Sequence, residues 1–144
     1  MIDVIGVIYP VPANLVDRFF NGSADVFVKY VPHKSIRILP RHKIVFYASH
    51  ASKKLVGEGV IESIEFLTPE EAYAKYENRV FLKEKEFHDY SGRFPNRPPT
   101  KEVLVLVLGK LKKYREPMEY GRPITMAGQY FTADQYELLI RKRE

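Results

Sequence analysis

The amino-acid sequence predicts a mainly β fold of the α+β class, a mixed pseudo-barrel with peripheral helices formed by one domain over residues 1–144. Strand-like segments dominate the chain, and most follow one another without the regular crossover helices of a doubly wound sheet. The length of 144 residues and the apolar content of 45% suit a single hydrophobic core. Two helix-start motifs place helices outside the run of strands.

Five segments have the β-branched or alternating apolar pattern of strands. They are residues 4–9, 26–31, 43–50, 55–66 and 103–108. Pro10 is expected to end the first, and residues 35–39 are expected to form a further short strand. Gly57 and Gly59 predict a bulge or sharp bend within the fourth segment, where a barrel wall must curve.

Helices are predicted at three main places. Pro12 suits a first helical turn, and the following apolar residues share one face until Asn21-Gly22 ends the helix. Thr68 and Glu71 form a capping box for a helix over residues 68–78, and Thr132-Ala-Asp-Gln135 begins a C-terminal helix. That last helix is expected to pack three side chains inward: Tyr136, Leu139 and Ile140.

The remaining segments are assigned less regular structure. Residues 81–90 are expected to form a shorter helix, and residues 92–100 form a proline-rich loop that carries arginines. Residues 114–128 contain two prolines and two glycines, and are expected to be irregular or to hold a short strand.

The composition excludes several kinds of chemistry. The chain has no cysteine, which excludes disulfides, thiolate zinc sites and cysteine nucleophiles. His33, His42 and His50 have spacings that fit no known ligand pattern, so neither a metal nor any other cofactor is expected. The chain has no run of roughly 18 apolar residues and no basic, apolar start. A cytoplasmic protein that does not bind membranes is therefore expected.

The charge is distributed unevenly along the chain. Residues 26–57 carry seven Lys or Arg and no acid, whereas residues 58–90 carry nine acids and four bases. Such a block creates a positive potential that attracts polyanions such as nucleic acid. The alternative is a solvated basic surface that binds nothing in particular.

The candidate nucleic-acid-binding residues lie in and around this block. Those expected to contact phosphate are Lys29, Lys34, Arg37, Lys53 and Lys54. Further polar candidates are His33, Ser49, His50, Arg93 and Arg97. Aromatic rings that could stack on a base are Tyr30, Tyr9, Tyr47 and Phe94, although most rings of the chain must belong to its core.

Candidate catalytic residues are fewer than candidate binding residues. Ser49 and His50 are adjacent on a strand and point to opposite faces, so they cannot form a nucleophile–base pair. Glu58 and Glu62 share a strand face and could move protons. Their simpler interpretation is a solvated strand face.

Two segments resemble a known superfamily. Residues 39–50, Leu-Pro-Arg-His-Lys-Ile-Val-Phe-Tyr-Ala-Ser-His, and residues 55–61, Leu-Val-Gly-Glu-Gly-Val-Ile, resemble PUA-like proteins of the ASCH and EVE branches, most closely an uncharacterised archaeal family. Residues 128–132 are similar to the EVE segment that enters the last helix. The resemblance implies a pseudo-barrel whose basic cleft binds RNA or a modified base, with Lys29 and the turn after Tyr47 lining it.

The chain departs from the ASCH signature Gly-x-Lys-x-x-Glu-x-Arg. Gly22 and Lys29 lie in the corresponding region, but their spacing differs and no Glu follows. Three functions follow from the sequence. The first is a non-enzymatic nucleic-acid-binding domain, with RNA as the expected partner. The second is an ASCH-like hydrolase of modified nucleosides, in which Lys29 and Glu58 would be catalytic. The third is a protein-interaction module using the acidic residues 58–89, whose partner the sequence does not name.

Overall fold

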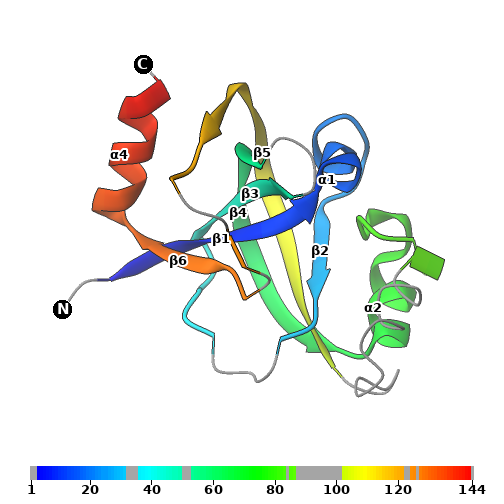
Figure 1. Cartoon of the computed structure of the whole chain (residues 1–144). Coiled ribbons are helices and arrows are strands. Elements are labelled where there is room, and N and C mark those ends of the chain that lie inside the picture. Colours follow the sequence, from blue (N-terminus) through cyan, green and yellow to red (C-terminus); the bar gives the residue numbers. More distant parts are fainter. Residues whose placement is uncertain are drawn as a thin grey trace.

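The computed structural model describes residues 3–31, 36–49, 53–83, 85–86, 102–121, 124–125 and 127–143, with residues 140–143 as backbone alone. Its centre is a six-stranded mixed sheet in the order β2-β5-β4-β3-β1-β6 (Figure 1). The strands are β1 (Val4–Pro12), β2 (Val26–Lys29), β3 (Lys43–Ser49), β4 (Lys54–Leu67), β5 (Val103–Glu119) and β6 (Gln129–Thr132). Among these described strands, only β1 and β3 pair in parallel. The predicted mixed, mainly β fold is confirmed.

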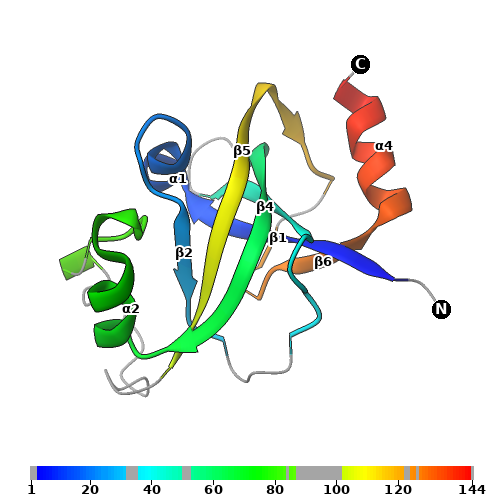
Figure 2. The same ribbon diagram turned by 180° about the vertical axis from the view of Figure 1, so that it is seen from behind.

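Helices lie at two sides of the curled sheet. α1 (Ala13–Phe20), α2 (Pro69–Tyr76) and the 3-10 turn η1 (Glu77–Arg79) lie on one side, and α4 (Ala133–Arg143) lies on the other (Figure 2). Both predicted capping boxes are present. The Thr68 hydroxyl accepts from the Glu71 amide at 3.2 Å, and the Thr132 hydroxyl accepts from the Gln135 amide at 3.3 Å. Among the described residues, no helix is both long and apolar enough to cross a membrane.

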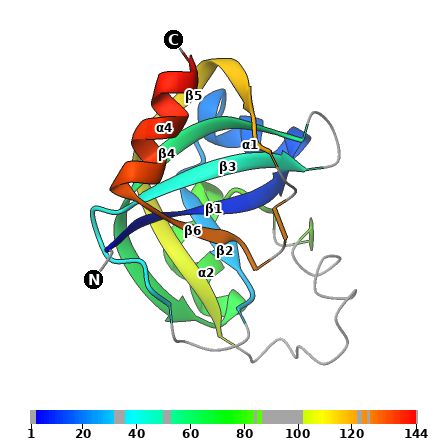
Figure 3. The ribbon, with the colours of Figure 1, turned by 60° about the vertical axis from the view of Figure 1, so that its left-hand side comes forward.

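β3 is buried on both faces, which explains its unbroken apolar pattern. Ile44 and Phe46 pack in the main hydrophobic cluster, inside the curl, together with Tyr9. Val45 and Tyr47 pack in a second cluster on the opposite face. Figure 3 shows β4, β3, β1 and β6 side by side, so strands flank both edges of β3 while the two clusters cover its faces.

Gly57 lets α1 pack directly against β4. A Cβ at this position would lie 2.3 Å from Cζ of Phe20 and 2.7 Å from the carbonyl oxygen of Lys112. The β4–β5 ladder also shifts register at three places, one of them between Leu55 and Gly57. The register shift confirms the expected bulge in this strand. Glycine is required at position 57 because only a residue without a side chain permits so close an approach.

Three strand predictions need correction. β1 continues through Pro10 to Pro12, because β6 pairs with it only as far as Ile8 and proline is tolerated where a strand has a free edge. Residues 36–39 form no strand. They lead into a turn in which the Leu39 amide donates to Nδ1 of His42 at 2.9 Å.

β5 extends to Glu119, so the strand alternative holds for residues 114–119, but as the end of one long strand and not as a short separate one. Its outer half escaped prediction because the apolar run stops at Leu108 and the strand continues with charged, exposed residues. β6 was also missed, since four residues are too short for a clear pattern. Phe81 and Leu82 lie in a bend and not in the expected helix. Lys85 and Glu86 are helical, as expected for this segment. Residues 84 and 87–90, and all of the expected loop at residues 92–100, fall outside the described residues.

Candidate functional site

The sheet curls until β1 and β2 face each other, but no described ladder joins these two strands. β2 pairs with β5, whereas β1 pairs with β3 and β6. Side chains close the gap instead: Tyr9 of β1 stacks on Phe27 of β2 with ring centroids 5.5 Å apart. We call this junction the seam and define it by Tyr9, Phe27, Lys29, Arg37 and Tyr130.

Lys29 is the last residue of β2 and reaches across the seam. Its Nζ lies 5.3 Å from the centroid of the Tyr9 ring, and the residue is only 7% exposed. An ammonium group over an aromatic face is attracted by the ring quadrupole, and this attraction strengthens when both groups leave water. Burial, together with the neighbouring Tyr130, raises the pKa of the Tyr9 hydroxyl, which therefore stays protonated.

Arg37 and Tyr130 form the more accessible part of the seam. The Arg37 guanidinium carbon lies 5.5 Å from the Tyr130 ring centroid, and the Arg37 amide donates to the Tyr130 hydroxyl at 3.2 Å. Arg37 is exposed and Tyr130 is half-buried. Tyr130 was not singled out from the sequence. Successive side chains of β6 face opposite clusters, Tyr130 the main one and Phe131 the second. This alternation is the sequence signal that could have identified Tyr130.

Gly128 brings the chain close to the seam just before β6. Its φ of +77° favours glycine, and a Cβ would lie 2.6 Å from two atoms of the Tyr9 ring. The backbone therefore lies against the Tyr9 ring. With Phe27 also stacked on it, Tyr9 supports the seam from within, and Tyr130 is the ring nearer to solvent.

The other predicted site residues have varied positions. Tyr30 is 3% exposed in the main cluster and Tyr47 is 5% exposed in the second. Ser49 is half-buried at the end of β3; Lys53 is exposed, and Lys54 lies opposite Glu119. The candidates outside the described residues are His33, Lys34, His50, Arg93, Phe94 and Arg97.

Metal-ligand side chains do not gather in the described part of the chain, which holds no group of three or more. Of the three histidines considered, only His42 is described. Its Nδ1 accepts from the Leu39 amide, and burial lowers its pKa.

Glu58 is buried, so the expectation of a solvated strand face is wrong for this residue and correct only for the exposed Glu62. The Glu58 carboxylate accepts hydrogen bonds from Lys43 at 2.9 Å, Tyr114 at 3.0 Å and Tyr136 at 2.6 Å. Burial alone would raise its pKa, but these hydrogen bonds and the Lys43 charge bring the pKa below its ordinary value. The ionised Glu58 carboxylate thus links its own strand, β4, to β3, β5 and α4 through hydrogen bonds.

The structure does not bring Lys29 and Glu58 together. Lys29 lies opposite Leu104 and Glu58 opposite Lys112 on the same strand. Those partners are eight residues apart, which corresponds to about 26 Å along β5. Lys29 contacts Tyr9 of the main cluster, whereas Glu58 contacts Tyr114 and Tyr136 of the second cluster, so the two side chains of the proposed hydrolase lie against different clusters.

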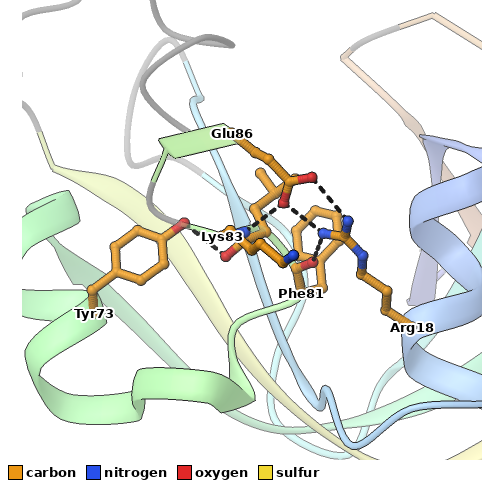
Figure 4. Close-up of polar contacts among 6 residues, drawn as sticks. Arg18, Tyr73, Phe81, Lys83 and Glu86 are labelled. Atoms are coloured by element: carbon orange, nitrogen blue, oxygen red, sulfur yellow. Dashed lines mark hydrogen bonds and ion pairs between the residues drawn. The ribbon is translucent and has the colours of Figure 1, made fainter.

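A cavity of about 510 Å³ lies beside α1, where sequence reasoning had predicted no site. Arg18 lines this cavity, and Figure 4 shows its polar contacts: Nη1 and Nη2 of Arg18 contact the two carboxylate oxygens of Glu86 at 2.6 and 2.8 Å. Nη1 also donates to the Phe81 carbonyl at 2.9 Å. Hydrogen bonds from Arg18 lower the pKa of Glu86 to about 2. The Arg18 guanidinium thus forms hydrogen bonds within the protein, so this side of the cavity has a structural role.

Solved structures with the same architecture include two from other proteins. The crystal structure of ASCH from Zymomonas mobilis aligns with a TM-score of 0.77 and 14% identity, over 95% of this chain and 94% of that chain. The N-terminal domain of Staphylothermus marinus McrB aligns with a TM-score of 0.61 and 14% identity, over 99% and 98% of the two chains. At such identities the likeness shows the fold alone, and that fold is ASCH-like, as the sequence resemblance implied.

Closer similarity exists at the level of sequence. An uncharacterized protein of Methanocaldococcus jannaschii is 33% identical over 110 residues, which cover 69% of this chain and 98% of that protein. The family model described as a domain of unknown function, DUF365, matches residues 4–133. Fold and sequence comparisons therefore agree: the fold is ASCH-like, and the chain belongs to the DUF365 family.

Proposed function

We propose that this protein is a non-enzymatic RNA-binding domain whose seam holds a base against Tyr130 and phosphate beside Arg37 and Lys29. The observation that carries the proposal is the pair of cation–aromatic contacts at one junction, Lys29 over Tyr9 and Arg37 over Tyr130. Proteins that bind single strands combine such cations, which attract the backbone, with rings on which bases stack.

The surroundings of the seam support the same function. Lys29 and Arg37 belong to the block of residues 26–57 that has seven bases and no acid. The PUA-like resemblance implies a cleft for RNA or a modified base in this part of the fold. Lys53 and Lys54, in the same block, would contact phosphates that flank the bound base.

The hydrolase alternative has less support. Glu58, its proposed proton carrier, accepts from three donors and has a lowered pKa, so it is poorly suited to give or take protons near neutral pH. Its partners Tyr114 and Tyr136 also belong to the second cluster, whereas Lys29 contacts Tyr9 of the main cluster. For the interaction-module alternative, two acids of residues 58–89, Glu65 and Glu86, are already paired with Lys75 and Arg18.

The test is binding of fluorescently labelled single-stranded RNA across a series of salt concentrations, with Lys29→Met as the variant. We expect the wild-type association constant to fall as salt rises, and the variant to bind about tenfold more weakly, the loss typical of one charge-assisted contact. Lys75→Met, which removes an exposed lysine on α2, is the matched control and should bind like the wild type. Absence of binding at low salt would refute the proposal.

Tyr130→Trp gives a second, optical measurement. The chain has no tryptophan, so this substitution places a single tryptophan, which can be excited selectively, at the seam. A base stacked on the indole should quench its emission, whereas inorganic phosphate should not. Equal responses to both would contradict a base-binding seam.

A further inference from the structure

β5 has a free edge in its outer half. Its ladder with β2 ends at Val107, and the Leu108 amide then donates to the Asp25 carbonyl at 2.8 Å. From Gly109 onward β5 pairs only with β4 among the described strands. Within the described part of the chain, no strand takes up the backbone donors and acceptors along this side, as on the edge strand of a sheet.

Four basic residues line this free edge. They are Lys110, Lys112, Lys113 and Arg115, and all four are exposed. We call residues 109–115 the edge arm; it contains no acid. Lys113 lies 3.8 Å from Asp17, with both side chains more than half exposed, a pairing that contributes little. The other three make no ion pair within the described part of the chain.

The apolar residues of the edge arm point into the protein. Leu111 packs against the main cluster, and Tyr114 is buried beside Glu58 in the second. The arm therefore offers charge without the exposed apolar side chains that insert into a lipid surface. Closely spaced cations on an exposed strand match a partner with regularly repeated negative charges, which is the phosphate backbone of a nucleic acid.

We propose that the edge arm binds the backbone of the nucleic acid whose base is held at the seam, so that the ligand is a polynucleotide and not a free nucleoside or nucleotide. This inference rests on the proposed function of the seam. Leu104, opposite Lys29, and Lys112 of the arm are eight residues apart on β5, or about 26 Å along the strand. At about 3.4 Å per stacked nucleotide, a single-stranded RNA that follows β5 from Lys29 to the edge arm has about eight nucleotides.

A structural role for the same lysines must be separated from binding. Charged residues on a free edge prevent pairing with the edge of another molecule. Under that role, neutral variants would self-associate but would bind RNA as before.

The experiment compares two triple variants that lose equal charge. The test variant is Lys110→Gln/Lys112→Gln/Arg115→Gln; the control, around α2 and the following segment, is Lys75→Gln/Lys83→Gln/Lys85→Gln. Each is measured with RNAs of about 4, 8 and 16 nucleotides across a salt series. The slope of log K against log salt should fall by about 2 in the test variant, because each single-strand phosphate contact contributes about 0.7. The control should keep the wild-type slope.

Length dependence gives the second readout. Wild-type affinity should rise steeply between the short and middle lengths, and the test variant should lose most of that rise. Lys29→Met should weaken binding at every length, including the shortest. If Lys29→Met weakens binding while the test variant keeps slope and length dependence, the seam proposal stands and the edge-arm inference is overturned. If wild type binds none of the RNAs, both fail.

Two further measurements complete the test. Thermal unfolding verifies that the triple variants fold; if the test variant does not, the three single substitutions replace it, each expected to lower the slope by about 0.7. Vesicles containing anionic lipid test the other polyanionic surface. Vesicle binding that depends on the edge arm, with RNA binding unchanged, would overturn the inference.

Discussion

Glu58 shows how one buried side chain can join several elements. Its carboxylate is 9% exposed and accepts from Lys43 of β3, Tyr114 of β5 and Tyr136 of α4. Tyr136 also stacks on Phe131 and lies under the Lys43 ammonium, 5.0 Å from its ring centroid. The position of α4 on the sheet therefore depends on an acceptor that belongs to β4.

We expect Glu58→Ala to lower the free energy of unfolding by about 2–4 kcal/mol, because three donors lose their acceptor and a half-buried ammonium loses its counter-charge. Urea denaturation at neutral pH measures this loss. Glu62→Ala, at an exposed position of the same strand, is the control and should change stability by less than about 0.5 kcal/mol. Equal effects of the two substitutions would show that the Glu58 network does not stabilise the fold.

Single residues were predictable where chemistry is local. The acid-free block identified Lys29 and Arg37, and the structure places both at the seam. Burial could not be predicted, because it depends on strands far apart in sequence. Glu58 belongs to a charged stretch, yet Tyr114 and Tyr136, which satisfy it, lie 56 and 78 residues away.

At the scale of elements, Arg18 of α1 is joined to the segment after η1 through Glu86. The pKa of Glu86 is lowered from 4.5 to about 2, chiefly by the Arg18 hydrogen bonds (Figure 4). A group whose pKa is lower in the folded than in the unfolded state stabilises the fold above its unfolded pKa. That stabilisation disappears as pH falls through the folded value.

The stability difference between wild type and Glu86→Gln should therefore be largest above about pH 4.5 and should shrink towards zero near pH 2. Chemical denaturation at several pH values measures it. Glu62→Gln, which neutralises an exposed carboxylate of β4, is the control for general charge effects. A difference that stayed constant from pH 6 down to about pH 2 would contradict the ion-pair explanation.

Element boundaries were predictable where a local signal marks them. The capping boxes at Thr68 and Thr132 fix the starts of two helices through contacts within four residues. The outer half of β5 carries no such signal. Its strand conformation comes from pairing with β4, through three register shifts and a positive φ at Lys110, which erase the alternation of a regular strand.

At the scale of the whole molecule, the strand order β2-β5-β4-β3-β1-β6 makes the central strands more stable against local opening than the edge strand β6. β3 lies between β1 and β4, and its residues from Ile44 to Ala48 are all buried. β6 is a four-residue edge strand that pairs with β1 alone among the described strands. The sheet order could not be predicted, because β6 was missed and because the parallel β1–β3 pair skips β2 in the sequence.

Hydrogen exchange should reveal this gradient. Amides of β3 are protected by ladders on both sides and by two hydrophobic clusters, so they should exchange only through global unfolding. Amides of β6 should exchange through local opening, several orders of magnitude faster, because releasing β6 breaks one short ladder. RNA bound at the seam would slow exchange in β6, since Tyr130 lies there, and would leave β3 almost unchanged. Exchange in β6 as slow as in β3 without ligand would mean that the seam is a rigid part of the core, and not an edge that a ligand can order.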